Sequence, residues 1–166
     1  MRQEVTIILV MGVSGTGKTT IGKKLAAALN WKFVDADSFH STANLEKMSQ
    51  GIPLNDSDRI PWLKALQTAI EKWLQADQNT VLACSSLKAA YRQMLWRDPQ
   101  RMQLVYLRGT FEVIAQRLAQ RQNHFMSKEL LQSQFDSLEE PNPATSLWVE
   151  VLHSPDAIVQ EIIQRL

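Results

Sequence analysis

The sequence predicts a single domain of the α/β class, an α/β sandwich built on a parallel sheet. The run Val5–Met11 is apolar, rich in β-branched residues and bounded by Gly12, as is typical of a strand buried on both faces of a parallel sheet. Four further strand-like runs alternate with helical patterns along the chain, which favours a sheet covered by helices. The length of 166 residues suits one domain with one core, so the domain is expected to span residues 1–166.

The remaining elements follow in order from hydrophobic spacing and turn residues. One apolar stripe marks the first helix: Ile21, Leu25, Ala28 and Leu29. The other four strands are expected at Lys32–Asp35, Thr80–Cys84, Gln103–Leu107 and Leu147–Leu152. Asp58 is expected to cap a long helix that has Pro61 in its first turn, and Ser154 is expected to cap the last helix.

Charge and composition exclude several classes of protein. The net charge of +1 gives no general electrostatic reason to bind nucleic acid or anionic lipid. Glu4 precedes the apolar start and a Gly/Lys loop follows it, unlike a signal peptide, and no run approaches the ~20 apolar residues of a membrane span. Cys84 is the only cysteine and is interpreted as a buried, inert thiol. We therefore expect a cytoplasmic protein with no nucleic-acid or membrane partner.

The first loop carries the strongest chemical signal. The pattern G-x-x-x-x-G-K-[ST] is matched at every fixed position by Gly12, Val13, Ser14, Gly15, Thr16, Gly17, Lys18 and Thr19. Backbone N–H groups in such a loop, together with the positive end of the following helix, make a cradle for nucleotide phosphates. Lys18 is expected to reach the β- and γ-phosphates, and Thr19 to ligate magnesium. The alternative, a glycine-rich turn without ligand, does not explain the lysine, the hydroxyl and the strand–helix context together.

This loop serves kinases, switches and motors alike, so other residues must decide between them. No Asn-Lys-x-Asp base-reading motif is present, and the strand ending at Cys84 leads into two serines without a magnesium-binding aspartate. Asp35 and Asp37 close the second predicted strand at alternate positions and can both project from its carboxyl end toward the phosphates. One carboxylate would hold magnesium through water while the other accepts a hydroxyl proton. The alternative is a pair of solvated loop acids.

Beyond the loop, the sequence resembles the gluconokinases. The resemblance rests on motifs in the family's order and spacing: Asp35–His40, Asn44–Met48, Gly51–Asp56, Asp58–Leu63, Ala83–Lys88 with Tyr91-Arg92, Tyr106–Gly109, Arg117–Arg121, His124-Phe125 and Ser133–Phe135. It implies the shikimate-kinase-like P-loop kinase fold in three layers, with a five-stranded parallel sheet of order 2-3-1-4-5 and a lid at about residues 117–127. It also implies ATP and Mg2+ as cofactors, D-gluconate as the substrate phosphorylated on its 6-hydroxyl, and a possible homodimer.

The resemblance also assigns substrate-binding residues. The gluconate carboxylate requires cations, which Arg59, Lys88 and Arg92 would supply. The hydroxyl partners would be Asp37, His40 and Gln134. The alternatives stay open for each: Arg59 as a surface charge, Lys88 and Arg92 as a solvated pair one helical turn apart, and His40 as a structural residue.

The resemblance finally assigns the catalytic groups. Asp37 would be the base, Lys18 and Arg121 would stabilise the transferred charge, and Arg117 would contact the nucleotide, although a solvated helical charge pair is the alternative for the two arginines. Asp35 would support the metal through water.

The sequence departs from the family pattern at Ala36, and two rival functions stay open. Ala36 occupies a position where the family often has glycine, so a positive φ there would be strained. His153 is interpreted as a surface residue. One rival function is a kinase for shikimate or a nucleotide, although Cys84–Lys88 lacks the glycine run expected near a shikimate ring. The other rival is an ATP-binding switch, against which the paired acids argue.

Overall fold

A parallel sheet of five strands forms the centre of the molecule. The computed structural model describes residues 4–120 and 127–166. The strands are β1 (Ile7–Met11), β2 (Lys32–Asp35), β3 (Thr80–Ala83), β4 (Met102–Arg108) and β5 (Ser146–Glu150). Their order is β2-β3-β1-β4-β5 and every pairing is parallel, which confirms the predicted topology. Ile7 of β1 is in register with Thr80 of β3 and Met102 of β4, so β1 lies at the middle of the sheet.

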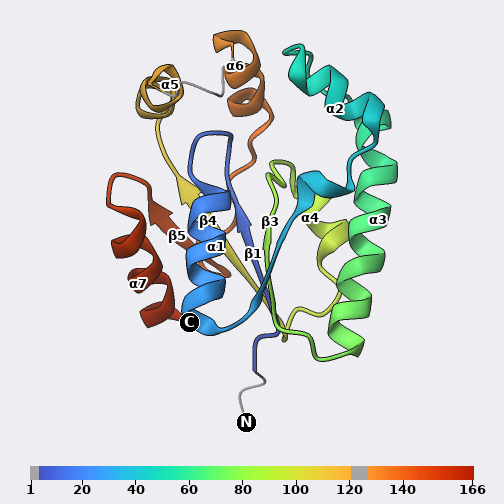
Figure 1. The fold of residues 1–166 in the computed structure, drawn as a ribbon, viewed down its shortest axis with the longest axis vertical. Helices are drawn as coiled ribbons and strands as arrows, with labels where there is room; N and C mark the ends of the chain where they lie inside the picture. The colour runs from blue at the N-terminus through green and yellow to red at the C-terminus, as the bar shows by residue number, and fades with distance from the viewer. Residues whose placement is uncertain (1–3, 121–126) are drawn as a thin grey trace.

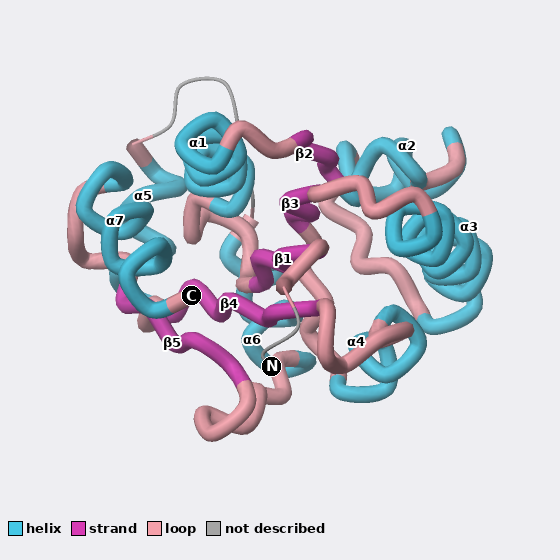
Figure 2. The backbone as a smooth tube through the Cα atoms, turned by 90° about the horizontal axis from the view of Figure 1, so that it is seen from below, coloured by secondary structure: helices cyan, strands magenta, loops and turns pink. Residues whose placement is uncertain are grey.

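Helices cover both faces of the sheet (Figure 1 and Figure 2). One face carries α1 (Lys18–Leu29) and α7 (Pro155–Arg165), and the other carries α3 (Asp56–Gln75) and α4 (Ala89–Leu95). Three more helices gather beyond the carboxyl ends of the strands, at the top of Figure 1: α2 (Thr42–Ser49), α5 (Phe111–Ala119) and α6 (Lys128–Ser137). A short 3₁₀ helix, η1 (Ala36–Phe39), joins β2 to α2. The carboxyl end of the sheet is therefore the end that can hold a ligand.

The side chains of β1 alternate between two apolar cores. Ile8 and Val10 belong to the core beneath α1 and α7, while Ile7 and Leu9 belong to the core beneath α3 and α4. All four are fully buried, as the continuous apolar run predicts for a central parallel strand. Each such side chain contributes about 1.5–3 kcal/mol by burial, so the strand that leads into the first loop is held firmly in place.

The start of α3 corrects one prediction. Asn55, not Asp58, is the N-cap: its Oδ1 accepts from Asp58 N at 2.8 Å, and Asp58 Oδ2 accepts from Asn55 N at 3.0 Å. The two side chains form a capping box, a pattern that the spacing Asn-x-x-Asp indicates equally well. Pro61 consequently lies inside the helix rather than in its first turn. The predicted cap of α7 is confirmed, because Ser154 Oγ accepts from Ala157 N at 3.2 Å.

Within residues 4–120 and 127–166, no helix combines the length and apolar character needed to cross a membrane.

Candidate active site

The loop between β1 and α1 has the geometry of a phosphate cradle. Gly15 and Gly17 have φ values of 87° and 93°, in the left-handed region that favours glycine. A Cβ on Gly15 would also lie 2.9 Å from Ile114 Cγ2, so a side chain there would collide with α5. Gly17 is the N-cap of α1, which places the positive end of this helix at the loop. The backbone thus matches what the glycine spacing predicts.

Two side chains brace the loop from within. The Thr16 hydroxyl donates to the Val13 carbonyl at 2.8 Å and is almost completely buried. Lys18 Nζ also donates to this carbonyl, at 3.1 Å. The ammonium group therefore lies folded over the loop, at the place where phosphate oxygens would meet it.

Asp35 connects the end of β2 to the start of α1. Its Oδ2 accepts from Thr19 Oγ1 at 3.2 Å, and its Oδ1 accepts from Asp37 N at 2.9 Å. A hydroxyl and a carboxylate side by side are oxygen donors of the kind that Mg²⁺ prefers. Among the residues described, no cluster of three or more His, Cys, Asp or Glu forms a complete metal cage. Mg²⁺ usually takes one or two protein ligands of this kind and completes its coordination with phosphates and water.

Asp37 lies two residues after Asp35 and borders the cleft between the phosphate loop and α3. Its side chain is 62% exposed, and partial burial where it borders the cleft desolvates the carboxyl. This desolvation and the nearby Asp35 raise the pKa of Asp37 above its ordinary value, while Lys18 acts in the lowering direction. A carboxylate with a raised pKa is a better proton acceptor than an ordinary surface acid.

His40 lies next to Asp37, and its ring stacks flat on the ring of Trp62. The two rings stack with centroids 4.3 Å apart and an interplanar angle of 13°, and Trp62 Nε1 donates to Ala36 O at 2.7 Å. The imidazole is only 4% exposed, and His40 Nε2 lies 3.9 Å from Asp37 Oδ1. Ala36 is not among the residues with positive φ, so the departure from glycine causes no strain there.

Arg59 enters the cleft from α3 and is held by an aromatic ring. Its Nη1 donates to Tyr91 Oη at 3.2 Å, and its guanidinium lies 5.5 Å from the centre of the Tyr91 ring. The Tyr91 hydroxyl in turn donates to Asp56, and Lys88 Nζ donates to Asp56 Oδ1 at 3.2 Å. The hydrogen bonds from Tyr91 and Lys88 lower the pKa of Asp56. Arg59 and Lys88 are thus linked through two residues for which sequence reasoning assigned no role.

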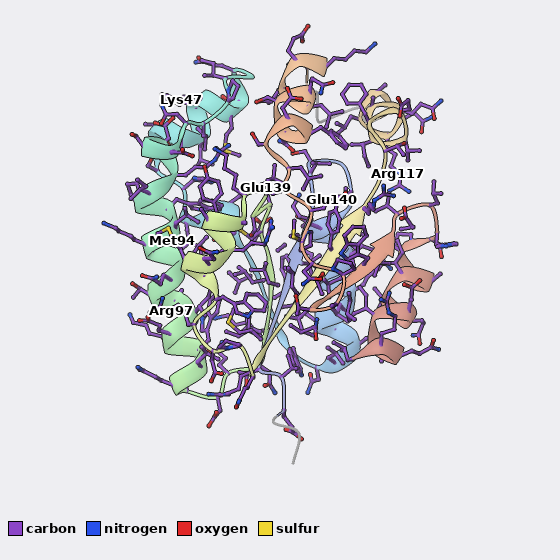
Figure 3. All side chains as sticks on the ribbon, turned by 180° about the vertical axis from the view of Figure 1, so that it is seen from behind. Lys47, Met94, Arg97, Arg117, Glu139 and Glu140 are labelled. Carbon is purple, nitrogen blue, oxygen red and sulfur yellow. The ribbon has the colours of Figure 1, made fainter. Side chains whose placement is uncertain are left out.

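Lys88 and Arg92 have different surroundings in the structure, and their expected convergence on an anion stays a prediction. Arg92 donates through Nη1 to Ser86 O at 2.8 Å and Leu87 O at 3.1 Å, and through Nη2 to Glu139 O at 2.8 Å. Three backbone carbonyls thus hold the guanidinium, and Figure 3 labels Glu139, which lies in the segment between α6 and β5. Lys88 borders a different depression of about 800 Å³ beside α6. Arg92 therefore fastens two segments together.

Gln134 makes two hydrogen bonds to the phosphate loop that the sequence did not predict. Its Oε1 accepts from Ser14 N at 2.7 Å and its Nε2 donates to Ser14 Oγ at 3.0 Å, so the amide ties α6 to the phosphate loop. It also borders the cleft, so a contact with a substrate hydroxyl stays a prediction.

A second cavity, of about 380 Å³, lies on the α7 side of the phosphate loop. It is lined by Gly15 and Thr20 on one side, and by Arg117 and His153 on the other. Arg117 lies at the end of α5 and donates to Val151 O (Figure 3). His153 is exposed as predicted, but its position at this cavity was not evident from the sequence. Arg121 and the rest of the predicted lid through residue 126 lie outside the described residues.

One cleft of about 820 Å³ brings most of the predicted site residues together. Lys18 and Thr19 line it on the nucleotide side, and Asp37, His40 and Arg59 line it on the other side. Trp62 also borders it. A phosphate cradle, a poised carboxylate and a cation thus share one cavity, which is the arrangement that phosphoryl transfer to a small acid requires.

Comparisons with known proteins agree with this geometry. A family profile described as "Shikimate kinase" matches residues 14–166. A gluconokinase from Arabidopsis thaliana is 45% identical, over 95% of this chain and 90% of the relative. The crystal structure of a gluconokinase from Sinorhizobium meliloti 1021 superposes with a TM-score of 0.87 at 38% identity, covering 98% of this chain and 92% of that one. The chain belongs to the gluconokinase family.

The gluconokinase family shares its fold with shikimate kinases. A shikimate kinase from Bacteroides thetaiotaomicron superposes with a TM-score of 0.69 at 20% identity, over 97% of this chain and 99% of that one. At this identity the likeness concerns the fold alone. Membership of the family confirms the predicted resemblance and the predicted class of enzyme, a kinase with a nucleotide-binding P-loop.

Proposed function

We propose that the protein transfers the γ-phosphoryl group of ATP to the 6-hydroxyl of D-gluconate, giving 6-phospho-D-gluconate and ADP. One observation carries the proposal: a single cleft joins the phosphate loop to a wall that holds Asp37, His40 and Arg59. The gluconokinase relatives from several organisms supply the identity of the acceptor.

The nucleotide would occupy the loop and the adjoining second cavity. Its phosphates would accept hydrogen bonds from the loop N–H groups and from Lys18, which would exchange its contact with Val13 O for phosphate oxygens. The base would lie in the 380 Å³ cavity beside Arg117. Thr19 and Asp35 would hold Mg²⁺, which when bound neutralises charge on the phosphate oxygens.

The acceptor would lie across the cleft from the loop. Arg59, already oriented by Tyr91, would bind the carboxylate of the sugar acid. The Asp37 carboxylate would accept the proton of the 6-hydroxyl as its oxygen forms a bond to the γ-phosphorus. The bond from this phosphorus to the bridging oxygen breaks and ADP leaves, so the proton ends on Asp37 and is then released to solvent. Positioning and electrostatic stabilisation supply most of the rate in such reactions.

Several points stay predictions. They are the part of Arg121 in stabilising the transferred charge, the contact between Gln134 and substrate, the cytoplasmic location and the homodimer.

An acceptor panel tests the proposed function. ADP release would be coupled to an optical readout with gluconate, shikimate, nucleoside monophosphates and no acceptor, at saturating MgATP. We expect turnover with gluconate to exceed every other arm and the product to carry phosphate on its terminal carbon by ³¹P NMR. Equal turnover with shikimate or without acceptor would contradict the assignment, and the second of these outcomes would favour an ATPase or switch.

A further inference from the structure

The buried amide of Asn44 makes contacts that determine the chemistry of His40. Asn44 lies in the first turn of α2 and is 6% exposed. Its Nδ2 is 2.8 Å from Asp58 O, in the first turn of α3, and 3.2 Å from His40 Nδ1. The amide thus joins the start of α2 both to α3 and to the His40 ring.

The orientation of this amide follows from its partners. A backbone carbonyl oxygen can only accept a hydrogen bond, so the atom of Asn44 that faces Asp58 O must be the NH₂ group. The second hydrogen of this group then points at His40 Nδ1, which must offer a lone pair. In a neutral imidazole with Nδ1 as acceptor, the proton resides on Nε2.

The surroundings of His40 keep the ring neutral and fixed. Two charged groups face it, Asp37 from η1 and Arg59 from α3. Burial and then the charge of Arg59 lower the pKa of His40 to about 4. The ring also stacks on Trp62, whose Nε1 is itself bonded to Ala36 O, so turning the ring about its Cβ–Cγ bond would break the stack. The ring atom toward Asp37 is Nε2, at 3.9 Å from Oδ1.

We infer that Asn44 is a positioning residue that holds His40 in the neutral tautomer protonated on Nε2, and so makes His40 a fixed hydrogen-bond donor beside Asp37. His40 is then unable to take the substrate proton. It donates to the oxygen of the acceptor hydroxyl or to the Asp37 carboxylate, which orients the pair for transfer. This kinetic consequence rests on the proposed function, whereas the tautomer is a property of the protein without substrate.

The tautomer can be observed directly. In protein labelled with ¹⁵N at histidine, long-range ¹H–¹⁵N correlation at pH 7 distinguishes a protonated ring nitrogen from an unprotonated one. His40→Gln identifies the signals of His40 by their loss. We expect Nε2 protonated and Nδ1 unprotonated, and a proton on Nδ1 would overturn the inference.

Replacing the amide tests the cause. In Asn44→Asp the carboxylate has no hydrogen to donate and can only accept, so the proton of His40 should move to Nδ1 or the ring should become a cation. Asn142→Asp is the matched control, because the Asn142 side chain only accepts, from Ala144 N at 2.9 Å. A neutral ring that keeps its proton on Nε2 and none on Nδ1 in folded Asn44→Asp would overturn the inference. We expect kcat to fall about 10- to 100-fold in Asn44→Asp, because His40 would lose the Nε2 proton that it donates toward the Asp37 carboxylate, and this is the usual effect of losing one hydrogen bond to a charged group.

Two replacements of His40 keep the inference testable if Asn44→Asp does not fold. His40→Phe retains an aromatic ring to stack on Trp62 but has no donor, whereas His40→Gln loses the stack and can place an NH₂ group near the position of Nε2. A donor role predicts a kcat at least 10-fold higher for the glutamine variant than for the phenylalanine variant. A role in packing alone predicts the reverse order, with the larger change in stability, and would overturn the inference.

Failure of the proposed function gives a different result. If another acceptor replaced gluconate in the panel, the tautomer of His40 would still be measured without substrate and the variants would be compared on the true acceptor. If the proton were found on Nδ1 while gluconate was phosphorylated, the inference would fail and the function would stand.

Discussion

The buried imidazole of His40 should make the stability of the protein depend on pH. The pKa of His40 lies near 4 in the folded protein, below its ordinary value of 6.5, because burial and Arg59 disfavour the cation. As pH falls from 6.5 toward 4, the unfolded chain takes up a proton that the folded protein does not. Stability is therefore complete above pH 6.5 and is lost through this window. Between pH 7 and pH 5 the loss from this one group amounts to about 2 kcal/mol.

Urea unfolding at pH 7 and pH 5 measures this loss. With a slope of about 2 kcal/mol per molar urea, the midpoint should fall by about 1 M more in the wild type than in His40→Gln. Other groups titrate in both proteins, so the difference between them isolates His40. His153→Gln removes an exposed imidazole and should retain the wild-type dependence. Equal midpoint shifts in the wild type and His40→Gln would refute the reasoning, since a histidine that charges freely in the fold produces no such difference.

Three further outcomes follow from the site and its supports. Asp37→Asn should lower kcat by about 10²-fold or more while the Kd for ATP stays unchanged, with Asp156→Asn as control; near-normal turnover would remove Asp37 as base. Arg92→Met should lower the free energy of unfolding by about 1.5–3 kcal/mol, because three carbonyls lose a charged donor, while Arg59→Met should instead raise the KM for gluconate. If Arg92→Met instead raised the KM for gluconate and left stability unchanged, Arg92 would be a substrate-binding residue. Cys84 is 2% exposed, and burial raises the pKa of its thiol to about 12. A thiol reagent at pH 8 should therefore label Cys84 only after unfolding, and rapid labelling of the folded protein would contradict this.

The alternation of strands and helices was predictable because its signals are local, whereas the strand order 2-3-1-4-5 was predicted from the family resemblance. Strand β1 is an apolar run fully buried in the sheet, and the loop that follows has spacing found in one backbone geometry. The boundary of α3 was missed because Asn55 and Asp58 are both good caps, and only the reciprocal hydrogen bonds show which residue precedes the helix.

The role of a site residue was predictable where its residue type has one chemical use in the motif. It was less predictable where the role depends on which groups the folded chain places beside the residue. Lys18 and Thr19 lie where the motif requires them. Arg92 was assigned by its charge, but whether a guanidinium meets a substrate or a backbone carbonyl depends on segments 47 residues apart in sequence. Asn44 and Tyr91 carry no functional signal of their own, because each acts through a neighbour that only the folded chain provides.

The division of the cleft bears on how such enzymes acquire new substrates. His40, Arg59 and Trp62 all come from the single stretch between β2 and the second turn of α3, whereas the phosphate cradle lies between β1 and α1. Mutation or recombination within that stretch can exchange the acceptor half while leaving the nucleotide half intact. The test is to replace this stretch with the corresponding stretch of a kinase that has a different acceptor. A change of acceptor preference would show that this one segment determines it.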